Sequence, residues 1–132
     1  MAVFEKKLIL GCFVLLTGCQ SRIKMKELDK EELGQIFTQE TEFIFELSKE
    51  ECPYCIMISE KEKGIDTYNH LPEYKYVLRA DSSDVSELEQ YLEPLKYVPC
   101  FYHLKNGKVV SYMIIKDWQN QENELQMWLN KQ

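Results

Sequence analysis

Glycine and proline are scarce in this sequence, with five and four residues among 132. Collagen-like and low-complexity chains contain far more of both, so this composition excludes those classes. Positive charge is also in deficit, because 16 Lys and Arg residues stand against 22 Asp and Glu residues, giving a net charge of −6. A general nucleic-acid binder neutralises phosphates with an excess of basic residues, and this chain has no such excess. The remaining class is an acidic globular chain of one-domain length, 45% hydrophobic.

The most apolar run of the sequence is too short to span a bilayer, which takes roughly 20 residues. This run, LILGCFVLL at residues 8–16, follows a short basic start and precedes small residues, as in a secretory signal. It ends in Leu16-Thr17-Gly18-Cys19, which resembles the lipobox of bacterial lipoproteins. That resemblance implies a signal peptide over residues 1–18, cleaved before Cys19, and a diacyl lipid on the Cys19 thiol. The alternative is an ordinary signal peptide that happens to end near a cysteine.

The cysteines divide according to this export signal. Of the five in the sequence, Cys12 leaves with the signal, Cys19 would carry lipid, and Cys52, Cys55 and Cys100 remain. An exported protein meets an oxidising compartment, in which paired cysteines form disulfides. One diacyl anchor supplies two chains, which is enough for stable attachment. The sequence therefore predicts a domain held by lipid at the extracytoplasmic face of a cell membrane.

After the cleavage point, predicted strands and helices alternate. Residues 22–28 suit a short edge strand or an extended tether. One helix begins after Asp29, which forms a capping box with Glu32, and another after Cys52, with Pro53 at its first position. The other predicted elements are strands over residues 42–47 and 74–80, a helix over 82–95 capped by Ser83 or Asp84, a hairpin turning at Asn106-Gly107, and a helix over 120–132. This alternation predicts a parallel sheet to which the hairpin adds an antiparallel strand.

A Cys-x-x-C motif between a strand and a helix is typical of thioredoxin-like proteins. Three segments carry that resemblance. The active-site strand, loop and helix of the family resemble FIFELSKEECPYCIMI, and the stretch around its cis-proline resembles YVPCFYHLKNGKVV. The strand between these two segments resembles YKYVLRAD. Residues 22–132 thus resemble a thioredoxin-fold thiol–disulfide oxidoreductase. The implied class is α/β, a central mixed sheet flanked by helices, with the domain at 29–132 and an anchor with a tether or edge strand at 19–28. Accessory redox proteins of Gram-positive bacteria also carry Cys-Pro-Tyr-Cys, which implies a Gram-positive source.

The resemblance implies a role for each cysteine of the motif. Cys52 matches the attacking thiol, and its place at a helix N-terminus favours the thiolate through the helix dipole. Cys55 matches the thiol that resolves the mixed disulfide. Glu46, six residues before Cys52, matches a buried acid that assists proton transfer. The lysine that usually neighbours this acid falls on Val77, which leaves Arg79 as the nearest predicted base.

The same resemblance implies a substrate surface and partners. Pro99 matches the cis-proline facing the pair, and Val98 would contact an extended substrate through its backbone. Pro53 and Tyr54 form the middle dipeptide beside the attacking thiol. The implied partners are protein thiols and disulfides, a membrane redox partner and, through the lipid anchor, the membrane itself, with no nucleic acid. No metal or organic cofactor is required.

Two alternatives stay open at this point. Cys100 follows the matched proline and is either a small buried residue or a third redox thiol beside the pair. A zinc site of Cys52, Cys55, Cys100 and His103 is disfavoured, because residues 100 and 103 of one strand point to opposite faces. The alternative function is a redox-inactive binding module, such as a chaperone or a transporter or bacteriocin accessory protein, whose cysteines serve only structure.

Overall fold

A computed structural model describes residues 21–22, 25–67, 70–79, 84–93, 95, 97–116 and 118–132. The predicted signal peptide over residues 1–18 and the predicted lipid site at Cys19 lie outside these residues. The elements are β1 (Ser21–Arg22), β2 (Lys26–Glu27), α2 (Lys30–Gln39), β3 (Glu42–Lys49), α3 (Pro53–Lys61), the 3-10 turn η1 (Glu62–Gly64), β4 (Asp66–Thr67), β5 (Glu73–Leu78), α4 (Val85–Leu88), β6 (Cys100–Lys105), β7 (Lys108–Ile114) and α5 (Trp118–Asn130).

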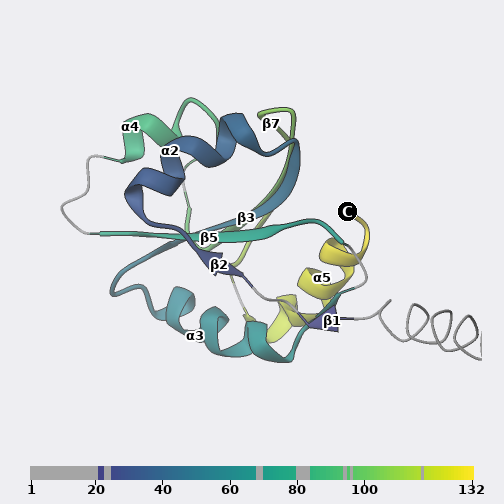
Figure 1. Ribbon diagram of the computed structural model, residues 1–132. Coiled ribbons are helices and arrows are strands. Elements are labelled where there is room, and N and C mark those ends of the chain that lie inside the picture. The colour runs from purple at the N-terminus through teal and green to yellow at the C-terminus, as the bar shows by residue number, and fades with distance from the viewer. Residues whose placement is uncertain are drawn as a thin grey trace, which may run out of the picture.

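The centre of the protein is a mixed five-stranded sheet in the order β2-β5-β3-β6-β7. Strands β2, β5 and β3 are parallel, whereas β6 is antiparallel to both β3 and β7. Parallel neighbours need crossover connections, which α2 and α3 provide. Helices α2 and α4 cover one face of the sheet, and α3 and α5 cover the other (Figure 1). The predicted fold class, a mixed sheet flanked by helices, is confirmed.

Strand β3 lies at the middle of the sheet, and its residues 43–48 are all buried. Side chains along a strand alternate between the two faces. One set joins the core against α2 and α4: Phe43, Phe45 and Leu47. Ile44 joins the core against α3 and α5, so Glu46 and Ser48 face the same side as Ile44. This alternation directs two polar side chains toward the helix that begins at the Cys-x-x-C motif.

The predicted capping box of α2 is confirmed. The Asp29 carboxylate accepts the Glu32 backbone N–H at 2.8 Å, and the Glu32 carboxylate accepts the Asp29 N–H at 3.2 Å. These bonds satisfy two of the N–H groups that a helix leaves without partners at its start.

We expect Asp29→Ala to lower the free energy of unfolding by about 1 kcal/mol, the usual cost of a lost N-cap. Chemical denaturation measures the change. Gln35→Ala, at an exposed position of the same helix, is the matched control and should change stability far less. An equal loss in both variants would show that the capping box contributes nothing.

Two predicted elements have different bounds. Of the helix expected over residues 82–95, the described residues are helical over Val85–Leu88, after which the chain turns with hydrogen bonds from Gln90 N–H to Glu87 O and from Tyr91 N–H to Leu88 O. Asp84 occupies the N-cap position, but its carboxylate accepts the Tyr76 hydroxyl instead of capping the helix. Ser83, the other predicted cap, lies outside the described residues.

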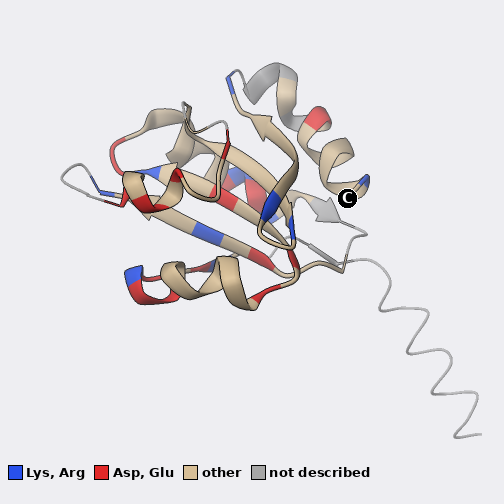
Figure 2. Cartoon of the chain, turned by 90° about the horizontal axis from the view of Figure 1, so that it is seen from above, with Lys and Arg blue, Asp and Glu red and all other residues tan. Residues whose placement is uncertain are grey.

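The segment left open as a strand or a tether includes the short strand β2, which pairs with the edge of β5. Before it, β1 pairs with β4 in a separate two-stranded sheet. Acidic and basic residues are interspersed along the described helices and strands (Figure 2). Within the described part of the chain, no helix is both long enough and apolar enough to cross a membrane.

Candidate active site

The site begins where β3 ends and α3 starts. Cys52 is the N-cap of α3, and Pro53 occupies its first turn, where a missing N–H leaves no hydrogen bond unmade. The Cys52 Sγ accepts the Cys55 backbone N–H at 3.3 Å. A sulfur in this position faces the positive end of the helix dipole. Cys52 is half-buried, so a reacting disulfide can reach it.

Cys55 lies one turn deeper and is 3% exposed. Both cysteines are free thiols in the structure. Burial, followed by the hydrogen bond with Cys52, raises the pKa of the Cys55 thiol to about 12. Cys55 is therefore a neutral thiol at physiological pH, and it needs a base before it can attack another sulfur.

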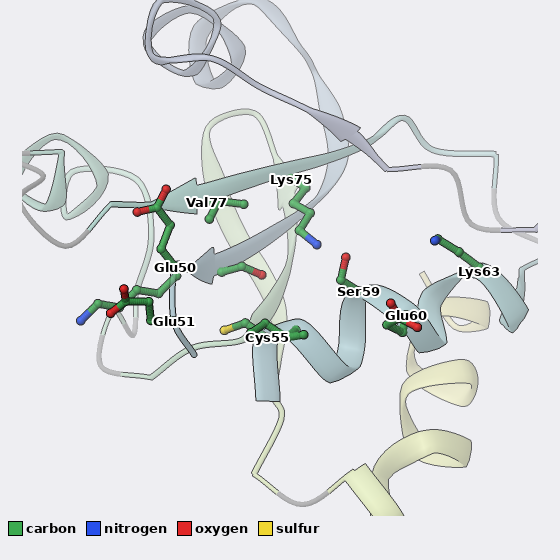
Figure 3. A pocket seen from close by; sticks show the side chains of 11 residues that line it. Glu50, Glu51, Cys55, Ser59, Glu60, Lys63, Lys75 and Val77 are labelled. Carbon is green, nitrogen blue, oxygen red and sulfur yellow. The ribbon is translucent and has the colours of Figure 1, made fainter. Parts of the chain in front are cut away.

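A cavity of about 270 Å³ opens beside Cys55, between α3 and β5. Glu50 and Glu51 stand on the loop at one end of it, and the Lys75 side chain reaches down from β5 toward Ser59 of α3 (Figure 3). A neighbouring cavity shares Ser59 and Lys75 and extends to Glu62. Through these shared lining residues, the surroundings of Cys55 adjoin a group of charged side chains.

Lys75, and not Arg79, is the base beside the predicted acid. Glu46 is fully buried, and its Oε1 lies 3.7 Å from the Lys75 Nζ. The sequence-based assignment to Val77 and Arg79 is wrong because Glu46 and Lys75 are register partners in the parallel pairing of β3 and β5. The two side chains therefore lie on the same face of the sheet.

Sequence reasoning also missed Ser48 and Glu62. The Ser48 hydroxyl donates to the Glu46 Oε1 at 3.2 Å, and Ser48 lines the same cavity as Cys55. The Glu62 Oε2 lies 3.9 Å from the Lys75 Nζ. A signal for Glu62 was present, because residues 55, 58 and 62 follow the helical period and share one face.

The residues predicted to bind substrate lie on two segments. The Val98-Pro99 peptide bond is cis, as the resemblance implies, with Pro99 buried and Val98 half-buried. Pro53 and Tyr54 lie at the start of α3, where Tyr54 is 47% exposed and the nearby Ile56 is 61% exposed. Tyr97, before the cis bond, is also exposed. Their roles in substrate binding remain predictions.

Cys100 is not brought beside the motif. It is fully buried, pairs with Leu47 across β3 and β6, and lies in the core against α2 and α4, on the sheet face opposite α3. Burial raises the pKa of its thiol to about 11. Because the sheet separates Cys100 from Cys55, we assign it a packing role.

The described residues hold no group of three or more His, Cys, Asp or Glu side chains arranged to bind a metal ion. His103 instead contacts the Glu42 Oε1 at 2.7 Å and the Gln132 Oε1 at 2.8 Å.

No protein-family model and no curated protein matches this sequence. Solved structures do match. The chain is similar to the oxidised thioredoxin of Plasmodium falciparum, with a TM-score of 0.54 and 22% identity over 80% of this chain and 99% of that one. It is similar to spinach chloroplast thioredoxin f, with a TM-score of 0.54 and 15% identity over 79% and 92% of the two chains. It is also similar to thioredoxin O2 of Arabidopsis thaliana in its oxidised state, with a TM-score of 0.53 and 15% identity over 83% of this chain and 99% of that one.

The chain is an α/β protein in which a mixed sheet lies between two helical layers. More particularly, these similarities show that the chain has the thioredoxin fold. The predicted fold is therefore confirmed.

Proposed function

We propose that this protein is a thiol–disulfide oxidoreductase that exchanges disulfides with protein substrates through Cys52 and Cys55. The observation that carries the proposal is the contrast between the two thiols. Cys52 caps α3 and is accessible, whereas Cys55 is buried one turn deeper as a neutral thiol. An accessible nucleophile beside a buried resolving thiol is the arrangement that two-step disulfide exchange needs.

The exchange proceeds through a mixed disulfide. The Cys52 thiolate attacks a substrate disulfide, a bond forms between Cys52 and one substrate sulfur, and the other substrate sulfur leaves as a thiolate that takes up a proton. Cys55 then loses its proton and attacks the Cys52 sulfur, which releases the second substrate thiol. Two electrons pass from the dithiol to the substrate, and the reverse sequence forms a disulfide in the substrate.

The surface around Cys52 favours a protein as the substrate. Tyr54, Ile56 and Tyr97 expose large apolar side chains on the segments that carry the motif and the cis-proline. Aromatic and apolar side chains of this kind are enriched in protein–protein contacts. We propose that Val98 and Pro99 hold an extended segment of the substrate across Cys52, as the resemblance implies.

A trapping experiment tests this proposal. Cys55→Ser removes the resolving thiol, so we expect a mixed disulfide between Cys52 and a disulfide-bonded peptide to accumulate as the main species, seen by mass spectrometry. Cys52→Ser is the matched control and should form no adduct. If the adduct fails to form in Cys55→Ser, or forms equally in Cys52→Ser, the assignment of Cys52 as nucleophile is wrong.

We further propose that the domain is anchored by lipid at the extracytoplasmic face of a bacterial membrane. The Leu16-Thr17-Gly18-Cys19 sequence supports this location. Because that compartment is oxidising, a reductase there would draw electrons from a membrane partner, and an oxidase would pass them to an acceptor.

We expect Cys19→Ala to abolish incorporation of labelled fatty acid and to lower the share of the protein found in the membrane fraction. Fractionation of bacteria that express the full chain measures both effects. Cys12→Ala, within the predicted signal, is the matched control and should keep the label. Equal labelling of both variants would contradict a lipid on Cys19.

A further inference from the structure

Three charged side chains from three elements meet behind the Cys-x-x-C motif. Glu46 of β3 is 0% exposed, and Glu62 of η1 is 7% exposed. The Nζ of Lys75, from β5, lies 3.7 Å from Glu46 Oε1 and 3.9 Å from Glu62 Oε2. Two carboxylates and one ammonium group carry a net charge of −1, which is costly where water is excluded.

One oxygen of each carboxyl group has no partner. Among the described residues, Glu46 Oε2 and Glu62 Oε1 are the buried side-chain oxygens without a hydrogen bond. A single proton between the two carboxyl groups would satisfy both oxygens and bring the cluster to neutrality. Burial and the neighbouring carboxyl group of Glu46 also raise the pKa of Glu62 to about 10, which agrees with a proton held there.

We propose that Glu46 and Glu62 share one proton beside Lys75, and that the Ser48 hydroxyl passes this proton to the Cys55 sulfur when the Cys52–Cys55 disulfide opens. This inference rests on the proposed function and adds Glu62 and Ser48 to its proton transfer. Ser48 connects the two parts, because its hydroxyl donates to the Glu46 Oε1 and it lines the same cavity as Cys55.

A substrate thiolate attacks the Cys52 sulfur, a new disulfide bond forms, and the Cys52–Cys55 bond breaks with its electron pair on the Cys55 sulfur. Ser48 gives its proton to that sulfur and takes the shared proton from Glu46 and Glu62. The two carboxylates are left beside Lys75 and regain a proton from solvent, and the reverse steps accompany closure of the disulfide.

The pKa values of the Cys55 thiol and of the Glu62 carboxyl group explain why a second carboxyl group is needed. The Cys55 thiol, with a pKa of about 12, gives up its proton so reluctantly that an ordinary carboxylate would not accept it. A carboxyl group whose pKa is raised to about 10 is a far closer match.

The other ionisable groups around this cluster lie at the rims of the two cavities. Glu27 of β2 and Lys63 of η1 line the cavity that reaches Glu62. Lys49, Glu50, Glu51 and Glu60 line the cavity beside Cys55, and all four are exposed. Exposed charges are screened by water, so they affect the shared proton less than Lys75 does.

Infrared spectroscopy of the full chain at pH 8 tests the shared proton directly. Exposed carboxyl groups are ionised there, so we expect one band from a protonated carboxyl group. The band should disappear in Glu46→Gln and also in Glu62→Gln, because either carboxyl group alone beside Lys75 would ionise. Glu60→Gln, an exposed acid of α3, is the matched control and should keep the band. Absence of the band from the unsubstituted protein overturns the proposal, as does its persistence in Glu62→Gln.

The rate at which dithiothreitol opens the Cys52–Cys55 disulfide tests the proton transfer. We expect Glu62→Gln and Ser48→Ala each to slow opening by about tenfold, less than the full loss of an acid–base group. Glu60→Gln should leave the rate unchanged, and an equal rate in all variants would overturn the role of Glu62. If no Cys52–Cys55 disulfide forms at all, the proposed function fails, and the infrared band still decides whether the proton is shared.

Discussion

Cys52→Ser is expected to reduce turnover with a disulfide substrate by at least about a thousandfold, because the nucleophile begins both half-reactions. The expectation follows from the position of Cys52 at the N-terminus of α3, where it is the accessible thiol of the pair. Reduction of a disulfide-bonded peptide by the full chain, with a chemical reductant supplying electrons, measures the rate.

Cys100→Ala is the matched control for this loss. Cys100 lies on the opposite face of the sheet from α3, so its removal should leave turnover within a few fold of the unsubstituted protein even if stability falls. Turnover that survives in Cys52→Ser, or disappears in Cys100→Ala, would show that the Cys-x-x-C motif does not carry out the reaction.

Glu62→Gln is expected to stabilise the protein on the order of 2 kcal/mol at pH 7 and to have little effect at pH 4. Burial and the neighbouring Glu46 raise the pKa of Glu62 from its ordinary 4.5 to about 10 in the folded state. Below pH 4.5 both the folded and the unfolded chain hold this proton. Between pH 4.5 and 10 the unfolded chain loses the proton while the folded chain keeps it, so stability falls as pH rises.

Glutamine stays neutral at every pH and removes this dependence. Urea denaturation between pH 4 and pH 9 measures the difference between the two proteins, which should widen steadily as pH rises. Glu60→Gln, which replaces an exposed acid of α3, should show no such widening. A constant difference across the range would mean that Glu62 ionises inside the folded protein much as it does in the unfolded chain.

The features that sequence alone predicted well are local in the chain. The Asp29–Glu32 capping box, the start of α3 after Cys52 and the Asn106-Gly107 turn each depend on a few neighbouring residues. Such features follow from backbone preferences and from side chains that reach only the next turn. The alternation of strands and helices then restricts the topology to few arrangements.

The features that sequence missed depend on how distant segments align. Lys75 faces Glu46 only because β3 and β5 pair in one particular register, and a shift of one residue would direct it to the other face. Glu62 reaches the same cluster because η1 continues the direction of α3 past Lys61. The missing side-chain cap of α4 has a similar cause, since the Asp84 carboxylate accepts the hydroxyl of Tyr76 in β5.

The central claim is that Cys52 and Cys55 form one redox couple, and a redox titration in glutathione buffers tests it most directly. Thiols are alkylated at each potential and counted by mass spectrometry. We predict that Cys52 and Cys55 convert together in a single two-electron step while Cys100 stays a thiol. A midpoint near about −270 mV would indicate a reductant, and one near about −120 mV an oxidant. Independent titration of Cys52 and Cys55, or no disulfide between them at any potential, would contradict the claim and leave the domain as a binding module.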